Sequence, residues 1–233
     1  MGRLVLPGKP PIEITLRRSR RSRRLSLRVS SLDGKVTMTI PERVDQRMAQ
    51  KFAAEREAWL RRTLQGQQPP SPVAGGATVL FEGREIRVET GPERRTRLEG
   101  DVLRVPASRA VPASVKAFLK ALARERLAAA SDKYAARVGQ DFRQIALRDT
   151  RSRWGSCSSD GRLMYSWRLI MAPPEVLDYV AAHEVAHLVH LDHSPAFWAL
   201  VGEICPSYGT HRTWLRDNGA SLHRYRFDPV PVA

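Results

Sequence analysis

The chain has 233 residues, of which 42% are hydrophobic, enough to form the core of one large domain or of two modest ones. No apolar run approaches the ~20 residues of a membrane-spanning helix, and two cysteines are too few for a disulfide-stapled scaffold. Lys and Arg exceed Asp and Glu by 15, which favours anionic partners such as nucleic acid, nucleotides or acidic proteins. The N-terminus also lacks the apolar stretch of a secretory signal, so we expect a cytoplasmic protein that does not enter the membrane.

The first 107 residues are predicted to form a β-rich region. Apolar and polar residues alternate in three runs within residues 11–41, a pattern typical of strands with one buried face, and residues 31–34 favour a hairpin turn. The period changes to that of an amphipathic helix over residues 44–64. Residues 66–76 are rich in Gly, Pro and Gln, a composition that predicts a flexible loop.

Six arginines lie within residues 17–24, between two of the strand patterns. This run allows two interpretations, a solvated hairpin turn or an anion-binding surface for nucleotide or nucleic acid. No aromatic residue interrupts it, so a stacking platform for single strands is not indicated.

A second set of strand patterns follows over residues 79–105, separated by glycines as in a small meander. An Ala- and Leu-rich helix is expected over residues 114–138, ending near Gly139. Short strands are expected within residues 143–171. Further helices are predicted from Glu175 to about His190, from Ser194-Pro195, and near residues 208–216. The pattern predicts an α+β fold, with antiparallel strands and a helix in the N-terminal region and a mainly helical C-terminal region.

The sequence His183-Glu-Val-Ala-His187 carries the clearest chemical signal. Two histidines four residues apart on a helix differ by only ~40° in direction and ~6 Å in height, so both imidazoles can bind one tetrahedral ion such as Zn²⁺. Glu184 is then placed to accept a proton from a zinc-bound water as general base.

A catalytic zinc needs a third protein ligand, and the chain offers several. His193 is favoured, because the helix should break before Ser194 and a turn can bring this imidazole back towards the ion. Glu203 and His211 remain alternatives that packing of the following helices would decide. His190 lies ~10 Å along the axis from His183, which is too collinear for a ligand, so we expect it to be a pocket residue.

Further segments extend the pattern around this motif. They are Arg-Ser-Arg-Trp-Gly-Ser-Cys at 151–157, Trp-Arg-Leu-Ile-Met-Ala-Pro-Pro at 167–174, His-Ser-Pro-Ala-Phe-Trp at 193–198 and Arg-Thr-Trp-Leu-Arg at 212–216. Together with the His-Glu motif, the chain resembles the YgjP-like metallopeptidase-domain family, which is related to the SprT-like and WLM zinc metallopeptidases. The resemblance implies a zincin-like domain over residues 108–233, with His193 as the third metal ligand. It also implies that the short strands within residues 143–171 form one wall of the cleft.

The resemblance implies a zinc-dependent hydrolase, and a metallopeptidase acting on polypeptide is the leading interpretation. A metal-dependent nucleoside-triphosphate pyrophosphohydrolase is an alternative, because this activity has been associated with a member of the family. A nucleic-acid-associated module with a structural metal is a third, for which Cys157 would be a fourth ligand.

Developing negative charge in the reaction needs a hydrogen-bond donor close to the ion. Arg153, Tyr165, Tyr208 and His211 are candidates, and Arg153 is favoured because it lies in the segment that resembles the family motif. Cys205 has no partner motif and is expected to be a small buried hydrophobic residue.

Overall fold

The computed structural model describes residues 2–30, 34–65 and 69–228. Contacts divide the chain into two compact units, Met1–Pro70 and Ser71–Ala233, here called the N-terminal and C-terminal units. Each has its own hydrophobic core. Residues 31–33 of the expected hairpin turn and 66–68 of the expected loop lie outside the described residues.

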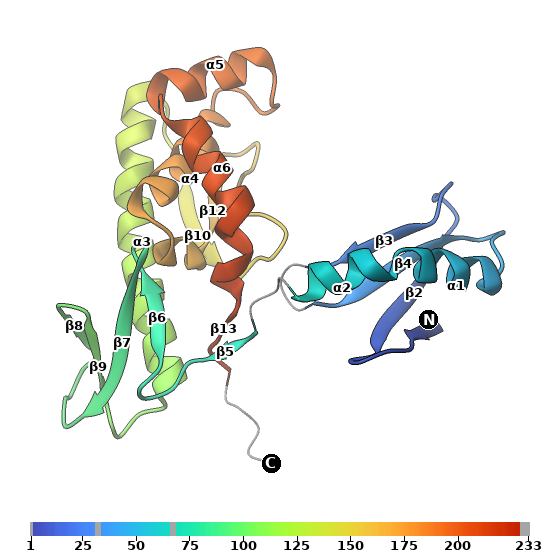
Figure 1. Ribbon diagram of the computed structural model, residues 1–233. Helices are drawn as coiled ribbons and strands as arrows, with labels where there is room; N and C mark the ends of the chain where they lie inside the picture. Colours follow the sequence, from blue (N-terminus) through green and yellow to red (C-terminus); the bar gives the residue numbers. More distant parts are fainter. Residues whose placement is uncertain (1, 31–33, 66–68, 229–233) are drawn as a thin grey trace. The chain divides into compact units, whose positions relative to one another are not determined.

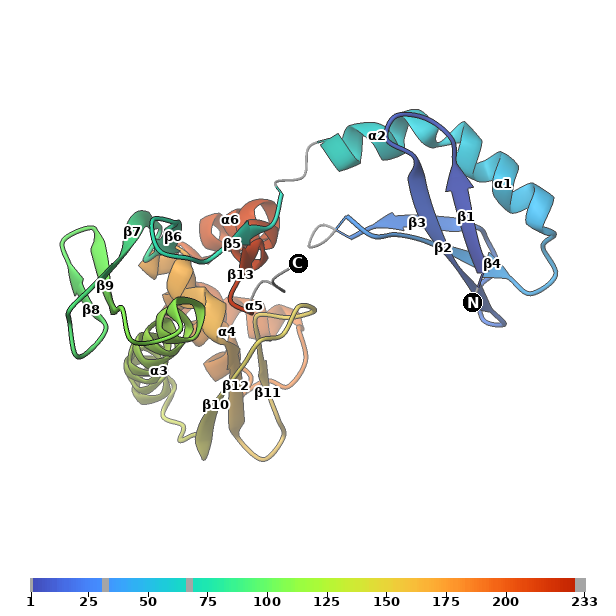
Figure 2. The same cartoon turned by 90° about the horizontal axis from the view of Figure 1, so that it is seen from below.

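The N-terminal unit is a sheet covered by helices on one face. Its elements are β1 (Gly2–Leu6), β2 (Ile12–Ser19), β3 (Ser26–Val29), β4 (Val36–Pro41), α1 (Gln46–Glu55) and α2 (Glu57–Gln65). Figure 2 shows α1 and α2 along one side of the sheet. Side chains such as Ile14, Met38 and Leu60 are fully buried between the two layers, which explains the alternation in the strands.

The strand order of this sheet is β1-β2-β4-β3, so β4 lies between β2 and β3. The arginine run therefore begins in β2 and continues into the connection to β3. Because β2 and β3 are not neighbours in the sheet, this connection is not a hairpin turn, which was one of the two interpretations of the run. The central pair β2–β4 is parallel and both outer pairs are antiparallel. The sheet is thus mixed, because the chain crosses over instead of returning directly.

The C-terminal unit begins with a second four-stranded sheet and continues into helices around a third, smaller sheet. Its strands are β5 (Ser71–Pro72), β6 (Thr78–Phe81), β7 (Arg84–Gly91), β8 (Arg97–Glu99), β9 (Val102–Pro106), β10 (Gln144–Arg148), β11 (Gly155–Cys157), β12 (Arg162–Ser166) and β13 (Tyr225–Arg226). Its α-helices are α3 (Val111–Val138), α4 (Pro174–Ala186), α5 (Pro195–Ile204) and α6 (Tyr208–Asn218). Two 3-10 helices complete it, η1 (Trp167–Met171) and η2 (Gly219–His223).

Strands β6–β9 belong to the C-terminal unit because they share its core. Figure 1 shows α3 running from this sheet past α4 and the β10–β12 sheet. In the turn between β6 and β7, the amide of Glu82 donates a hydrogen bond to the carbonyl of Ile170 at 2.8 Å. The next residue, Gly83, lies against Pro173 at the start of α4. The boundary expected at residue 107 therefore falls inside this unit.

The α+β class predicted from the sequence is confirmed, and the differences are local. The helix expected over residues 44–64 is two helices interrupted at Arg56. The expected meander has the order β6-β7-β9-β8, with β9 inserted between β7 and β8. Helix α3 ends as expected at Gly139, whose φ of 63° is a left-handed conformation that suits glycine. Among the described residues, every helix is too short or too polar to cross a bilayer.

Arg168 in η1 links the residue that follows β10 to the C-terminal segment of this unit. Its side chain is 8% exposed and pairs with Asp149 at 2.6 Å. It also donates to the carbonyls of Leu222 and Tyr225, at 2.8 and 3.2 Å. One side chain therefore satisfies two backbone acceptors and one carboxylate.

We expect Arg168→Met to lower the free energy of unfolding by about 3 kcal/mol, since it leaves a carboxylate and two carbonyls without their donor. Denaturant unfolding measures the loss. Arg162→Met is the matched control, because its guanidinium pairs with Asp160 on the surface with a side chain 58% exposed. Equal midpoints for the two variants would contradict a structural role for Arg168.

Candidate metal centre

Helix α4 carries the His-Glu motif and begins where the sequence predicts, at Pro174 after Pro173. It ends earlier than predicted, at Ala186, with His187 as its C-cap residue. The next amides bond back over a shorter span, from Leu188 to the carbonyl of Val185 and from Val189 to that of Ala186, at 2.9 and 3.1 Å. The chain turns at once, so that residues 188–193 lie beside the motif instead of extending the helix.

The turn brings a third histidine to the two on the helix. The ring centroids of His183, His187 and His193 lie 5.0, 5.1 and 4.7 Å apart in pairs, and one ligand atom from each lies within 4.8 Å of the other two. Ser194 fixes the end of the turn, because its hydroxyl caps α5 by accepting from the amide of Phe197 at 3.4 Å.

The donor set fits a tetrahedral ion of the zinc type. The Nε2 atoms of His183 and His193 are 3.1 Å apart. Two Zn–N bonds of ~2.0–2.1 Å at a tetrahedral angle would separate their nitrogens by about 3.3 Å. Three imidazoles leave one position open, which is the arrangement of catalytic rather than closed structural zinc sites.

His190 contributes through its backbone and not through its ring. Its carbonyl oxygen lies 2.9 Å from Nδ1 of His187. A carbonyl can only accept, so this bond places the proton of His187 on Nδ1 and leaves the Nε2 lone pair available. The early end of α4 allows this contact. If the helix continued through residue 190, the carbonyl of that residue would point along the helix axis.

Burial favours the neutral form of His183 and His187. Desolvation, followed by the neighbouring His187 and His193, lowers the pKa of His183 to about 3. Burial likewise lowers the pKa of His187. Neutral imidazole is the metal-binding form, so the environment favours a cation in the centre over protons on the rings.

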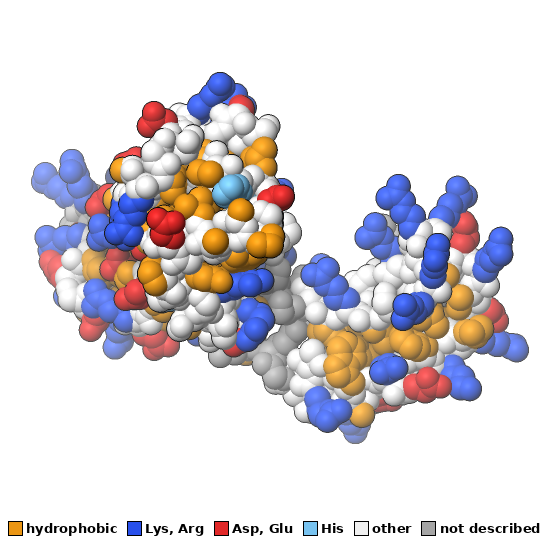
Figure 3. Space-filling view, turned by 90° about the horizontal axis from the view of Figure 1, so that it is seen from above, with side chains coloured by type: hydrophobic (Ala, Val, Ile, Leu, Met, Phe, Trp, Pro, Cys, Tyr) orange, Lys and Arg blue, Asp and Glu red, His pale blue; other side chains and the backbone are white. Residues whose placement is uncertain are grey.

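Aromatic side chains from α5 support the three rings. Phe197 is fully buried and stacks on His187 with 4.4 Å between centroids, and it also contacts His183 and His193. Trp198 lies 5.8 Å from the ring of His193. Figure 3 shows a histidine among hydrophobic side chains on the face of the C-terminal unit seen from above. The sequence showed Phe197 and Trp198 as part of the segment 193–198 but did not predict that they contact the histidines.

Glu184 lies between α4 and strand β11. It is 5% exposed, and burial raises its pKa to about 8, against the opposing positive charge of Arg153. Strand β11 passes so close that a Cβ atom on Gly155 would lie 2.4 Å from Oε1 of Glu184. The sheet expected within residues 143–171 therefore does form a wall beside the motif.

A cavity of about 400 Å³ opens over the three histidines and Glu184. Its walls come from β11 and the residues before it, from α4, from the turn after α4 and from α6. Arg153 and Cys157 both line it. The Cys157 thiol is directed to the carbonyl of Ser158 at 3.4 Å and stands outside the group of convergent metal-binding atoms, so a fourth ligand from Cys157 is not supported.

The other candidates for charge stabilisation lie elsewhere. Tyr165 is fully buried and its hydroxyl lies 3.0 Å from that of Ser131, and Tyr208 stacks on Trp198 at 5.5 Å. Neither lines the cavity. Their hydroxyl groups made them candidate donors, but the sequence could not show which way they face.

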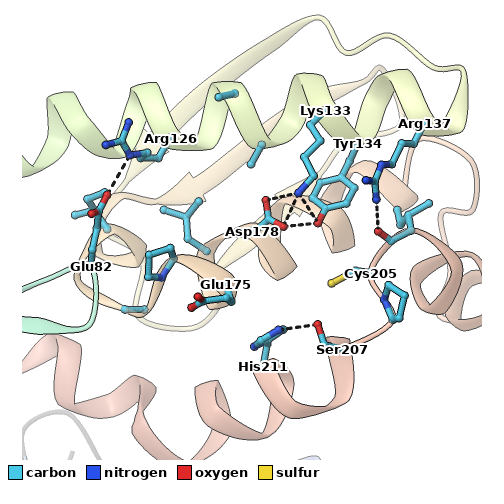
Figure 4. Close-up of a pocket in the computed structure, with 18 residues that line it drawn as sticks. Glu82, Arg126, Lys133, Tyr134, Arg137, Glu175, Asp178, Cys205, Ser207 and His211 are labelled. Atoms are coloured by element: carbon cyan, nitrogen blue, oxygen red, sulfur yellow. Dashed lines mark hydrogen bonds and ion pairs between the residues drawn. The ribbon is translucent and has the colours of Figure 1, made fainter.

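His211 and Glu203 are also outside the centre. Glu203 is exposed on α5 and does not line the cavity. His211 lines a separate hollow of about 530 Å³ between α3, α4 and α6, where its Nε2 lies 2.9 Å from the hydroxyl of Ser207 (Figure 4). Lys133 pairs there with Asp178 at 3.0 Å.

Two residues near the centre were missed from the sequence. Tyr179, one turn before His183 on α4, lies 6.0 Å from its ring and lines the cavity. Arg212 on α6 stacks over Trp198 at 4.6 Å, and its charge contributes to the lowered pKa of His183. The helical spacing of Tyr179 and His183 was a usable signal, whereas the position of Arg212 depends on how α6 packs.

Comparison with known proteins agrees with this geometry. A family model described as YgjP-like, metallopeptidase domain, matches residues 23–218. No curated protein and no solved structure matches the chain significantly. The description of the family indicates a metal-dependent hydrolase, consistent with a three-histidine group able to bind an ion. The chain belongs to the YgjP-like metallopeptidase-domain family.

Proposed function

We propose that the chain is a zinc-dependent peptidase whose ion is held by His183, His187 and His193. The observation that carries this proposal is the convergence of three imidazoles beside a buried carboxylate in one cavity. When bound, Zn²⁺ would polarise the scissile carbonyl and lower the pKa of a coordinated water.

Glu184 acts as the general base. Its carboxylate lies in the cavity next to the ligand histidines, where it accepts a proton from the attacking water and delivers it to the leaving amide nitrogen. Burial raises the pKa of this carboxyl group above its usual value, which makes it a stronger base than an exposed glutamate. Arg153 lines the same cavity and donates hydrogen bonds to the oxygen that becomes negative.

A polypeptide is the substrate that the cavity fits best. Strand β11 is an edge strand, paired on one side with β12, and can receive an extended peptide as an added strand. Leu191 on the rim is 65% exposed and offers an apolar contact for a substrate side chain. Arg153 is the only Lys or Arg among the lining residues described, which is little positive charge for a triphosphate.

The test is a metal measurement followed by two substrate assays. Purified protein should hold about one equivalent of zinc, lose casein hydrolysis with a chelator, and recover it when zinc is returned. A panel of nucleoside triphosphates is assayed in parallel. Hydrolysis of a triphosphate without peptidase activity would favour the pyrophosphohydrolase and reject the proposed substrate.

Gly155→Ala should impair catalysis without removing the metal. The new methyl group would collide with the carboxylate of Glu184 and displace it. A displacement of about 1 Å in an active site can reduce kcat by about 100-fold. Metal content and kcat are measured on the same sample.

Gly209→Ala on α6 is the matched control, since among the described residues no atom outside the local helix backbone and the adjacent residues lies within 4 Å of a Cβ placed there. It should leave both quantities unchanged. A Gly155→Ala protein with normal kcat would show that the position of Glu184 does not matter.

A further inference from the structure

The N-terminal unit holds a basic surface that the metal centre does not use. Its sheet has the order β1-β2-β4-β3, and the sheet of the C-terminal unit has the equivalent order β6-β7-β9-β8. In both, a parallel central pair is flanked by two antiparallel pairs. The two sheets have the same topology, so the charges on their solvent-facing surfaces can be compared.

The second sheet neutralises its arginines. Residues 78–106 contain six Lys and Arg and six Asp and Glu. Arg104 pairs with Glu89 and Glu99 at 3.1 and 2.9 Å, and Arg97 pairs with Glu99 at 3.0 Å. The segment thus has no net charge, and ion pairs connect its strands β7, β8 and β9.

The first sheet leaves most of its arginines unpaired. Residues 2–41 contain ten Lys and Arg against two Asp and Glu. Arg17 on β2 and Arg28 on β3 are exposed and form no ion pair with any described residue. Arg24, in the connection between these strands, is likewise exposed and without an ion pair to a described residue. Figure 3 shows Lys and Arg side chains projecting from this unit with few acidic ones between them.

The open face also carries hydroxyl groups in register with these arginines. Arg28 pairs with Thr37, which pairs with Thr15, and Arg17 pairs with Thr39 in the next row. Strands ~4.8 Å apart with a rise of ~3.4 Å per residue place the Cα atoms of Arg17 and Arg28 about 12 Å apart. Two guanidinium groups thus flank a strip of threonine hydroxyls on β4.

We propose that this open face binds double-helical RNA through its backbone. The shallow minor groove of an A-form duplex presents 2′-hydroxyls between two lines of phosphates, which matches hydroxyl groups flanked by arginines. The only aromatic residues of residues 1–70 are Phe52 and Trp59, both on helices, so the sheet offers single strands no stacking platform.

The test measures binding of a 20-base-pair RNA duplex to the full chain as a function of salt. Replacing Arg17, Arg24 and Arg28 with Gln should weaken binding at least tenfold and reduce the slope of log K against log salt by about 2–3, since each phosphate contact contributes about 0.9. Chelation of metal should not change the affinity.

The matched control removes three charges from the opposite face of the same unit. Arg47, Lys51 and Arg62 are exposed on α1 and α2, and their replacement with Gln should change the affinity less than threefold. Equal losses in both triple variants, or no binding by the wild-type chain, would overturn the proposal.

The hydroxyl strip gives a second, independent readout. Thr37→Val and Thr39→Val together keep the shape and charge of the face, and should remove the preference for RNA over a DNA duplex of the same sequence. Wild-type protein that binds DNA equally well, or that binds anionic lipid vesicles in place of RNA, would contradict the proposed ligand. Circular dichroism of each variant confirms that the sheet is retained.

Discussion

Glu184→Gln should lower kcat/KM for peptide hydrolysis by about 100- to 10,000-fold, the range expected when a general base is lost. Glutamine has nearly the same shape, but it cannot take a proton from water. The side chain is 5% exposed, between α4 and β11, so the amide has little room to adopt another position. Metal content should remain at one equivalent, because the three histidines are unchanged.

Glu203→Gln is the matched control for this variant. Glu203 lies on α5, is exposed, and does not line the cavity over the histidines. The Glu203→Gln protein should retain both metal and activity. This result would also agree with the conclusion that Glu203 is not the third metal ligand. If Glu184→Gln hydrolysed casein at the normal rate, the proposed base would be wrong.

His183→Ala should abolish stable metal binding. Loss of an outer partner of a ligand already weakens metal affinity by 10–100-fold, so loss of a ligand itself should exceed about 100-fold. Zinc per protein should fall from one to near zero after dialysis, and activity should fall with it. Titration with zinc in a competing chelator measures the change in affinity.

His190→Ala and His211→Ala are the controls for the metal measurement. The carbonyl of residue 190 supports His187 and is retained in an alanine variant, and His211 lies in the other cavity. Both proteins should keep one equivalent of zinc. Retention of full zinc affinity by His183→Ala would contradict the three-histidine centre.

The metal-binding motif was predictable because its residues are close in sequence. Residues 183, 184 and 187 are brought together by helical spacing alone, and the Ser194-Pro195 helix start required the chain to turn between the two helices. From this turn we predicted that His193 could lie beside the two motif histidines. In the structure its Nε2 atom is 3.1 Å from that of His183. The end of α4 at Ala186 was not predictable, because the apolar pattern continues to Val189.

The surroundings of the motif were less predictable. Of the four donors considered for charge stabilisation, only Arg153 lines the cavity, and it lies about thirty residues before the motif. Tyr165 has the alternation of a strand residue, yet its side chain faces the core under α3. Which face of a short strand meets a distant helix is set by packing, and local periodicity does not contain that information.

The amino-acid sequence by itself determined the two motif histidines of the candidate centre, the α+β class and most helix and strand positions, because these depend on spacing and turns within a few residues. Only the tertiary structure decided the order of the strands, the passage of Gly155 against Glu184, and the contrast between the neutralised and the basic sheet. Those features depend on contacts between segments far apart in the chain, where burial and backbone hydrogen bonds select one arrangement among several that the local pattern allows.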